Sequence, residues 1–412
     1  MNVKTATRTE QIWLKGGKTI TELCHLSKNL YNEANYIIRQ ELFKTGKWTR
    51  YNDLNKQLKE SSDNYKALPT QTAQQILILL DKSWKSFFKA IRVWKAHPEK
   101  FKARPKIPGY KKKEGEHILV FTNQQAKLRD GWLILPKVVG VKLKTRIKGG
   151  VREVRIIPHG VGYALEIVYK KVLEVIERNK ERIVGIDLGS ANIVTMVNNI
   201  GVQPIVVKDD GSGIKSINQY YNKRKAEIQS IYDLQGIKDG AKLRGLRAKR
   251  DRKSKDWTHK LSRFIVEWCM EHEIGTIIFG YNEGWKQRVN IGRRNNQTFT
   301  QIPFMEIINK TAYKAEEEGI EVKKEEESHT SKCSFLDNEP VEHREEYVGR
   351  RITRSLFKTT RGILIHADVN AGYNICKKAS PKAFSNGCEW IGGCALHPVC
   401  SYITRGGKLS NV

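Results

Sequence analysis

The sequence predicts a multidomain α/β protein, and three observations carry that prediction. The chain has 412 residues, which is enough for two or three domains with their own hydrophobic cores. A hydrophobic content of 39% and nine tryptophans are typical of a folded chain. The spacing of apolar residues changes twice along the sequence, from helical spacing to short strands, and then to strands that alternate with helices.

The charge balance points to a polyanionic partner. A formal net charge of +30 would make the chain repel itself unless a partner neutralised it, and this favours nucleic acid over a membrane surface. No apolar run reaches the length of a membrane span, and residues 1–10 lack the apolar core of a signal peptide. We therefore expect a soluble, cytoplasmic protein that associates with nucleic acid and not with a membrane.

Residues 1–175 predict a helical domain combined with a small β-barrel. Residues 1–18 indicate one strand that ends at a glycine pair. Residues 19–100 contain two stretches with apolar side chains at helical spacing, which we interpret as core helices. Residues 101–175 open with a basic, proline-rich segment and continue as short strands separated by turns, which is typical of a small antiparallel barrel.

From residue 176 onward the pattern is that of an α/β domain. An apolar strand ends at Asp187 in "IVGIDLGS", and two further strands follow in hairpin order. We expect a long basic helical segment over Lys215–Glu271, the strand "IGTIIFG", a helix around Phe304–Glu318 and a strand over Ile320–Lys324. Three strands, then helix, strand, helix and strand, is the order of an RNase H-like fold.

Two aspartates stand where this fold places metal-binding carboxylates. Asp187 ends the first strand, and Asp368 opens the last helix in "HADVNAGYNI". Two-metal cleavage of a phosphodiester needs a few carboxylates that hold two Mg²⁺ or Mn²⁺ ions about 3.5–4 Å apart. Each aspartate has a structural alternative, as a turn residue or as a helix cap. Their joint occurrence around a basic helical insertion favours catalysis.

Several motifs, in order, resemble one family. The segments "GIDLGSANIVTMV", "YNEGWKQ", "NNQTFTQIPF", "HTSKCSF" and "HADVNAGYNI" resemble TnpB, the transposon-encoded, RNA-guided DNA endonucleases related to type V CRISPR effectors. The resemblance is strong over Ile183–Lys378 and rests on pattern alone before that. It implies a wedge β-barrel over 1–18 and 101–175 and a recognition domain over 19–100. It also implies a RuvC-like nuclease domain with a basic helical insertion over 176–327, a degenerate zinc-ribbon-like insert that binds target nucleic acid over 328–362, and the last RuvC segment over 363–378. The C-terminal tail over 379–412 is expected to be poorly ordered.

The third carboxylate of such a site departs from the family pattern. The family's middle glutamate usually ends the fourth strand, where this sequence has Gly280 and Tyr281. The next strand ends in "KKEEESHTSK", and a glutamate there could reach the same ions from the neighbouring strand. Glu327 is the first candidate and Glu326 the second. A subset of TnpB-like proteins that this sequence resembles implies such a relocated glutamate. The alternatives are Glu283, a site without a third carboxylate, or glutamates that are only solvated charges.

The cysteines argue against zinc. The family commonly has two CxxC pairs in the insert, but here Cys333 stands alone, and we expect apolar residues to form the core of the insert. Near the C-terminus Cys388, Cys394, His397 and Cys400 have irregular spacing, so free thiols are favoured and a zinc site is the alternative. The expected cofactors are therefore two Mg²⁺ or Mn²⁺ ions.

The resemblance implies a guide RNA and a double-stranded target DNA as partners. Base pairing would then read the sequence, and dispersed basic residues would contact the backbones. For any one of these residues a solvated surface position is the alternative. The candidates for contact are Lys102, Arg104, Lys106, Lys111, Arg247, Arg250, Arg252, Lys286, Arg293, Arg294, Arg350 and Arg351.

Three functions follow from these observations. The favoured one is an RNA-guided DNA endonuclease, with Asp187, Glu327 or Glu326, and Asp368 as catalytic residues. The second is a nuclease-dead relative that represses by occupying its DNA target, which the glycine at the end of "IIFG" favours. The third is a DNA-binding accessory protein of a transposon that carries no RNA.

Overall fold

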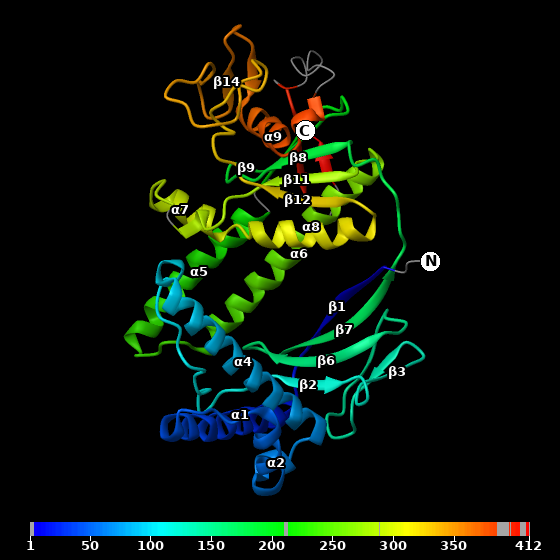
Figure 1. Ribbon diagram of the computed structural model, residues 1–412, viewed down its shortest axis with the longest axis vertical. Helices are drawn as coiled ribbons and strands as arrows, with labels where there is room; N and C mark the ends of the chain where they lie inside the picture. The colour runs from blue at the N-terminus through cyan, green and yellow to red at the C-terminus, as the bar shows by residue number, and fades with distance from the viewer. Residues whose placement is uncertain are drawn as a thin grey trace. The chain divides into compact units, whose positions relative to one another are not determined.

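The chain divides into two compact units, unit 1 (Met1–Leu173) and unit 2 (Glu174–Val412). The computed structural model describes residues 4–209, 213–287, 289–384, 395, 397–403 and 409–411 (Figure 1). Each unit is treated by itself below. Among the described residues, no helix is both long and apolar enough to cross a membrane.

The helices of unit 1 pack through one apolar face each. They are α1 (Lys18–Thr45), α2 (Tyr51–Ser61), α3 (Asp63–Lys66), α4 (Thr70–Ala96) and the 3₁₀ turn η1 (Pro98–Lys100). The indole N–H of the fully buried Trp84 in α4 donates to Asn35 Oδ1 in α1 at 3.0 Å, so its polar atom is satisfied inside the core. Helix α1 ends at Gly46, whose φ of 73° is the left-handed conformation that favours glycine.

The strands of unit 1 form two antiparallel sheets. They are β1 (Lys4–Leu14), β2 (Leu119–Thr122), β3 (Lys127–Arg129), β4 (Trp132–Ile134), β5 (Lys142–Lys144), β6 (Val151–Pro158) and β7 (Tyr163–Leu173). One sheet has the order β1-β7-β6-β2 and the other β3-β4-β5, so the described pairings do not close into the single barrel predicted from the sequence. Both sheets share one hydrophobic core with the helices, which explains why the predicted helical and barrel domains form one unit.

Unit 2 is built on a seven-stranded mixed sheet. Its strands are β8 (Ile183–Asp187), β9 (Asn192–Asn198), β10 (Ile205–Lys208), β11 (Thr276–Gly280), β12 (Glu321–Glu325), β16 (Val399–Ile403) and β17 (Leu409–Asn411), in the order β12-β11-β8-β9-β10-β16-β17. Strands β8, β9 and β10 are antiparallel neighbours, as the hairpin order predicts. Strands β11 and β12 run parallel to β8, so their carboxyl ends meet at one edge of the sheet.

Helices cover both faces of this sheet. They are α5 (Ile214–Leu234), α6 (Ala241–Glu271), η2 (Trp285–Gln287), α7 (Arg293–Gln301), α8 (Phe304–Glu317), α9 (Ala367–Ala379) and η3 (Pro381–Phe384). Val184 and Ile186 of β8 share a core with α6 and α8, and Ile183 shares the other core with α9. Figure 1 shows α8 and α9 on opposite sides of the strands. The basic helical segment expected over Lys215–Glu271 consists of two helices, α5 and α6, and the chain turns between them at Gly236, which has φ 67°.

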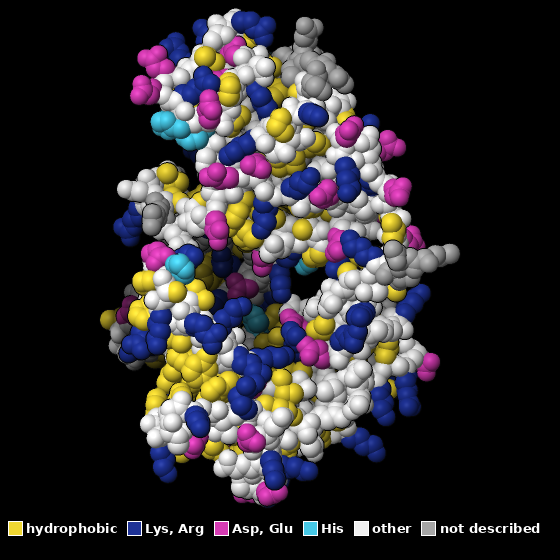
Figure 2. Space-filling model, viewed as in Figure 1, with side chains coloured by type: hydrophobic (Ala, Val, Ile, Leu, Met, Phe, Trp, Pro, Cys, Tyr) yellow, Lys and Arg dark blue, Asp and Glu magenta, His cyan; other side chains and the backbone are white. Residues whose placement is uncertain are grey.

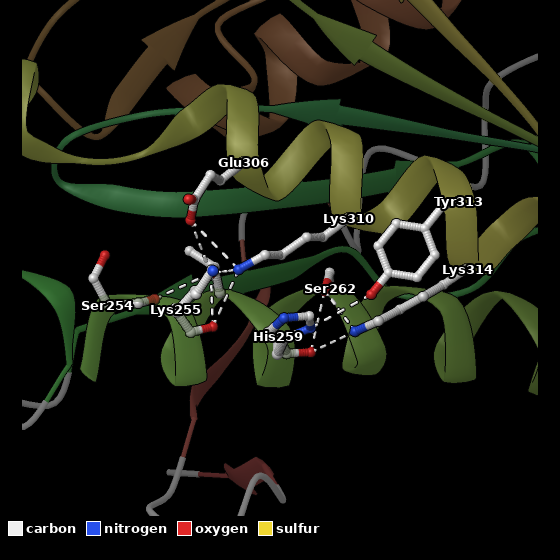
Figure 3. Close-up of polar contacts among 9 residues, drawn as sticks. Ser254, Lys255, His259, Ser262, Glu306, Lys310, Tyr313 and Lys314 are labelled. Atoms are coloured by element: carbon white, nitrogen blue, oxygen red, sulfur yellow. Dashed lines mark hydrogen bonds and ion pairs between the residues drawn. The ribbon is translucent and has the colours of Figure 1, made fainter. Parts of the chain in front are cut away.

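Helices α6 and α8 meet along a polar seam (Figure 3). Lys310 of α8 is 8% exposed, and its ammonium donates to the Lys255 carbonyl at 3.2 Å and pairs with Glu306 at 3.4 Å. Lys314 donates to the His259 carbonyl at 2.7 Å and to Ser262 Oγ at 2.8 Å. Burial is the main cause that lowers the pKa of Lys314 to about 8. These two lysines of α8 stabilise its packing against α6.

The insert predicted over 328–362 folds against α9. Strands β13 (Arg350–Arg351), β14 (Leu356–Lys358) and β15 (Leu364–His366) form a small antiparallel sheet in the order β13-β14-β15. Phe335 and Phe357 lie in one core with Tyr373 and Ile375 of α9. Apolar side chains therefore form the core of the insert, as the lone cysteine predicts.

The expectation of a poorly ordered tail after Lys378 is wrong for its described residues. Strand β16 pairs in parallel with β10, from Ile205 opposite Val399 to Lys208 opposite Tyr402. Strand β17 then pairs with β16. The reason is the edge of β10, whose unpaired N–H and C=O groups a further strand satisfies. Sequence spacing gives no sign of a partner so far along the chain.

Candidate active site

Three acidic side chains gather where β8 ends and α9 begins. Asp187 is the last residue of β8, and Asp368 lies in the first turn of α9. Burial raises the pKa of Asp187 well above its usual range, and the negative charges of Asp368 and then Glu327 raise it further, while Arg351 lowers it. Asp187 therefore lies close enough to both Asp368 and Glu327 for their charges to act on it, although the three residues come from distant parts of the sequence.

Glu327 follows β12 by two residues and lies over Gly280, the last residue of β11. Its Oε2 atom is 3.0 Å from the point where a Cβ on Gly280 would lie. Burial raises the pKa of the Glu327 carboxyl to about 7. Asn282 contacts Glu327 twice: its Nδ2 lies 3.4 Å from Oε1, and its Oδ1 accepts the Glu327 backbone N–H at 3.1 Å. No sequence pattern marked Asn282 as a residue of this site.

The other two candidate glutamates lie elsewhere. Glu326 is exposed, pairs with Lys378 at 3.5 Å and accepts the Ser328 hydroxyl at 2.5 Å. Glu283 is exposed in the turn after β11. Adjacent residues of an extended chain point to opposite sides, which explains why Glu327 and Glu326 diverge.

Asp368 does not cap its helix. The cap residue of α9 is His366, which makes no side-chain cap bond. Asp368 instead accepts the Asn192 amide on Oδ2 at 2.7 Å and the Arg351 guanidinium on Oδ1 at 3.3 Å. Asn192 begins β9 directly after the small-residue turn that follows Asp187. That position was the only feature of the sequence that marked Asn192 as a residue of the site, and Asn192 was not among the predicted site residues.

The donor atoms suit a hard divalent cation. Carboxylate oxygens are the ligands that Mg²⁺ and Mn²⁺ prefer, and a cation would relieve the repulsion that raises the pKa of Asp187. Within the described residues, no three His, Cys, Asp or Glu side chains lie close enough together to form a ready-made metal site. The chemistry therefore fits a metal, and the carboxylates would have to draw together around it.

Some basic candidates make contacts within the protein. These are Arg104 over the Trp94 ring, Lys111 over the Tyr31 ring, Arg250 to Asn218, Lys286 to the Thr300 and Ile302 carbonyls, and Arg351 to Asp368. Arg104 and Arg351 are nevertheless exposed, and so are Lys102, Lys106, Arg247, Arg252, Arg293, Arg294 and Arg350. Figure 2 shows lysine and arginine side chains scattered over the visible surface of each unit, with acidic side chains between them.

The two suggested zinc positions differ in what the structure describes. Cys333 is buried in the insert, and its Sγ lies 3.8 Å from the Glu342 carbonyl. Of the C-terminal group, Cys388 and Cys394 lie outside the described residues. Cys400 is a free thiol on β16.

Two family descriptions match parts of unit 2. The family described as "Probable transposase" (OrfB_IS605) matches residues 167–286, beginning just before the unit, and the Cas12f1-like TNB domain matches residues 304–375. The second match spans β12, the insert and most of α9. The first match thus includes Asp187, and the second includes Glu327 and Asp368.

Two relatives align with the chain. TnpB-like protein ORF457 of Acidianus two-tailed virus is 26% identical over 404 residues, covering 88% of this chain and 83% of that protein. The CRISPR-associated endodeoxyribonuclease Cas12f1 of Sulfoacidibacillus thermotolerans is 32% identical over 211 residues, covering 49% of this chain and 46% of that protein.

The solved structures that align with the chain are more distant in sequence. A Cas12f1–sgRNA–target DNA complex aligns over 92% of this chain and 100% of that chain, with a TM-score of 0.36 and 16% identity. The mini-RNA-guided endonuclease CRISPR-Cas_phi3 aligns over 92% of both chains, with a TM-score of 0.46 and 11% identity.

The fold is that of a mixed α/β multidomain protein. Its acidic side chains Asp368 and Glu327 lie near Asp187, at the start of α9 and beyond the end of β12. The two family matches and the two relatives point to one group of proteins: the chain is similar to a TnpB-like protein and to a Cas12f1 endodeoxyribonuclease.

Proposed function

We propose that this protein is an RNA-guided DNA endonuclease, and that unit 2 is an RNase H-like (RuvC) nuclease domain. The observation that carries the proposal is that Asp368 at the start of α9 and Glu327 over Gly280 both lie near enough to Asp187 for their charges to act on it. Similarity to a TnpB-like protein and to an endodeoxyribonuclease supports it. The third carboxylate would come from the end of β12, one strand over from Gly280.

Asp187, Glu327 and Asp368 would hold two Mg²⁺ or Mn²⁺ ions. When bound, such ions supply an activated water and stabilise the leaving oxygen of a phosphodiester. Asn192 would hold Asp368 from β9, because its amide donates to Oδ2. Arg351 carries a positive charge to the same carboxylate from the insert, where it could also meet a phosphate of the cleaved strand.

The partners would be a guide RNA encoded by the transposon and a double-stranded target DNA recognised beside a short flanking motif. The charge of +30 and the exposed basic residues support binding to nucleic-acid backbones. A relative of known structure is a complex with sgRNA and target DNA, as its description states. A location in the cytoplasm follows from these partners.

A cleavage assay tests this proposal. Full-length protein copurified with its own RNA is incubated with a plasmid library and Mg²⁺, and compared with Asp187→Asn, Glu327→Gln and Glu326→Gln. We expect at least about a hundredfold slower cleavage for the first two, because each loses a metal ligand, and near wild-type cleavage for Glu326→Gln. Cleavage that survives Glu327→Gln would overturn its assignment. RNA-dependent DNA binding without any cleavage would favour the nuclease-dead repressor, and absence of copurified RNA would favour the accessory protein.

A further inference from the structure

The end of β11 has a vacant side-chain position that Glu327 fills. An added Cβ on Gly280 would lie 2.5 Å from Ile375 Cδ1 and 3.0 Å from Glu327 Oε2. The first distance is too short for any real contact, and the second is tight. A side chain at position 280 would therefore force Ile375 and the Glu327 carboxyl to shift from their places between β11 and α9.

This vacant position faces the same side of the sheet as Asp187. An added Cβ on Gly185 would meet Cys376 Sγ of α9 at 2.3 Å, so Gly185 faces α9, and Asp187 two residues later shares that face. Ile278 belongs to the core that contains α9, and Gly280 two residues later shares its face. Strands β8 and β11 are paired neighbours. A carboxyl over Gly280 therefore lies beside Asp187, and the Glu327 carboxyl occupies that position.

Asn282 holds the chain that carries Glu327. Its Oδ1 accepts the Glu327 N–H at 3.1 Å, and its Nδ2 lies 3.4 Å from the Glu327 Oε1 atom. The backbone bond from Tyr281 N–H to the Glu325 carbonyl, 2.9 Å long, extends the β11–β12 pairing to the residues just before these. One side chain thus fixes both the backbone and the carboxyl of Glu327.

We propose that Gly280 and Asn282 together position Glu327 as a ligand from the neighbouring strand. Gly280 leaves the space, and Asn282 orients the carboxyl into it. This inference rests on the proposed function, because it assigns both residues a role in the same metal site. Neither residue touches the reacting atoms, so both are positioning residues.

The test measures Mn²⁺ binding by electron paramagnetic resonance to the full-length protein with its RNA, without DNA. The variants are Gly280→Ala, Asn282→Ala, Asn282→Asp and Glu327→Gln, with Asn52→Ala, at an exposed position of α2 in unit 1, as the matched control. Loss of a residue that orients a ligand typically weakens metal binding about 10–100-fold. We expect a loss in that range for the first three variants, and no change for the control.

A second readout separates positioning from general loss of structure. Hydrogen exchange over residues 321–332, without metal, reports the Glu327 N–H. Asn282→Asp keeps the acceptor for this N–H but loses the donor and adds a like charge beside Glu327. We expect this variant to keep the protection of the segment while losing Mn²⁺ affinity, and Asn282→Ala to lose both.

The outcomes are distinct. Mn²⁺ affinity within about twofold of wild type for both Asn282 variants would overturn the inference while leaving the proposed function intact. Loss of affinity in Asn282→Ala alone, with Asn282→Asp unchanged, would reduce Asn282 to a backbone role and also overturn it. A wild type that neither binds Mn²⁺ nor cleaves DNA would refute the proposed function, and the inference with it.

Discussion

At the scale of single residues, burial sets the pH at which Glu327 can act. Its pKa is raised from 4.5 to about 7, so a buried carboxyl that must lose its proton to bind a metal will do so only near neutral pH. We predict that Mn²⁺ affinity falls as the pH drops below about 7 and levels off above it. The measurement is a Mn²⁺ titration at several pH values, with Glu327→Gln as the control, whose profile should be flatter around neutrality.

In the metal-free protein, the raised pKa of Glu327 makes folding less stable as the pH rises, whereas metal binding strengthens with pH. Between about 4.5 and 7 the folded protein binds more protons than the unfolded chain, so the contribution of Glu327 makes the metal-free protein less stable as the pH rises through this window. Bound metal should reverse the trend. A stability profile of metal-free wild type that, relative to Glu327→Gln, does not fall over this range would contradict the cause assigned to the shift.

At the scale of elements, two asparagines of α9 hold the insert against that helix. Asn370 is fully buried; its Oδ1 accepts the Phe335 N–H at 3.0 Å, and its Nδ2 donates to the Cys333 carbonyl at 2.8 Å. Asn374 donates to the same carbonyl and to that of Thr330, each at 2.8 Å. These bonds tie the backbone of residues 330–335 to α9.

We predict that Asn370→Ala loosens the insert. The change leaves a buried N–H without its partner, which costs about 1–3 kcal/mol, and removes one of the two donors to the Cys333 carbonyl. Hydrogen exchange over 328–362 should therefore accelerate, while exchange in β8 and β9 stays slow. Lys358→Ala, at an exposed position of β14, is the matched control, and equal exchange in both variants would contradict the prediction.

At the scale of the whole molecule, the positive charge is dispersed, as binding to a backbone requires. For a protein that makes 6–10 phosphate contacts, affinity falls about 10³–10⁵-fold between 50 and 200 mM salt. We predict a dependence of this size for DNA binding by the RNA-loaded protein.

We also predict that Arg294→Gln lowers the salt slope by about one, since it would remove one phosphate contact. Arg263→Gln is the control, because Arg263 is held by Glu267 at 2.7 Å on the surface of α6. The measurement is the equilibrium binding constant at several salt concentrations. Equal slopes for the two variants would remove Arg294 from the nucleic-acid interface.

The sequence by itself determined the order of the strands and helices, the positions of Asp187 and Asp368 at element ends, and the positive charge. These features are local, since apolar spacing and the residue that ends an element depend on near neighbours in the chain. The sequence also favoured Glu327 over Glu326 for the site, but only through resemblance.

The tertiary structure decided what depends on contacts between distant residues. It placed Glu327 over Gly280, turned Lys286 inward, brought Arg351 to Asp368 and added β16 to the edge of the sheet. Strand pairing and the packing of α9 select these arrangements, and neither leaves a periodic signal in the sequence. A glycine in a strand shows only that something approaches closely, and the fold decides that here it is a carboxylate.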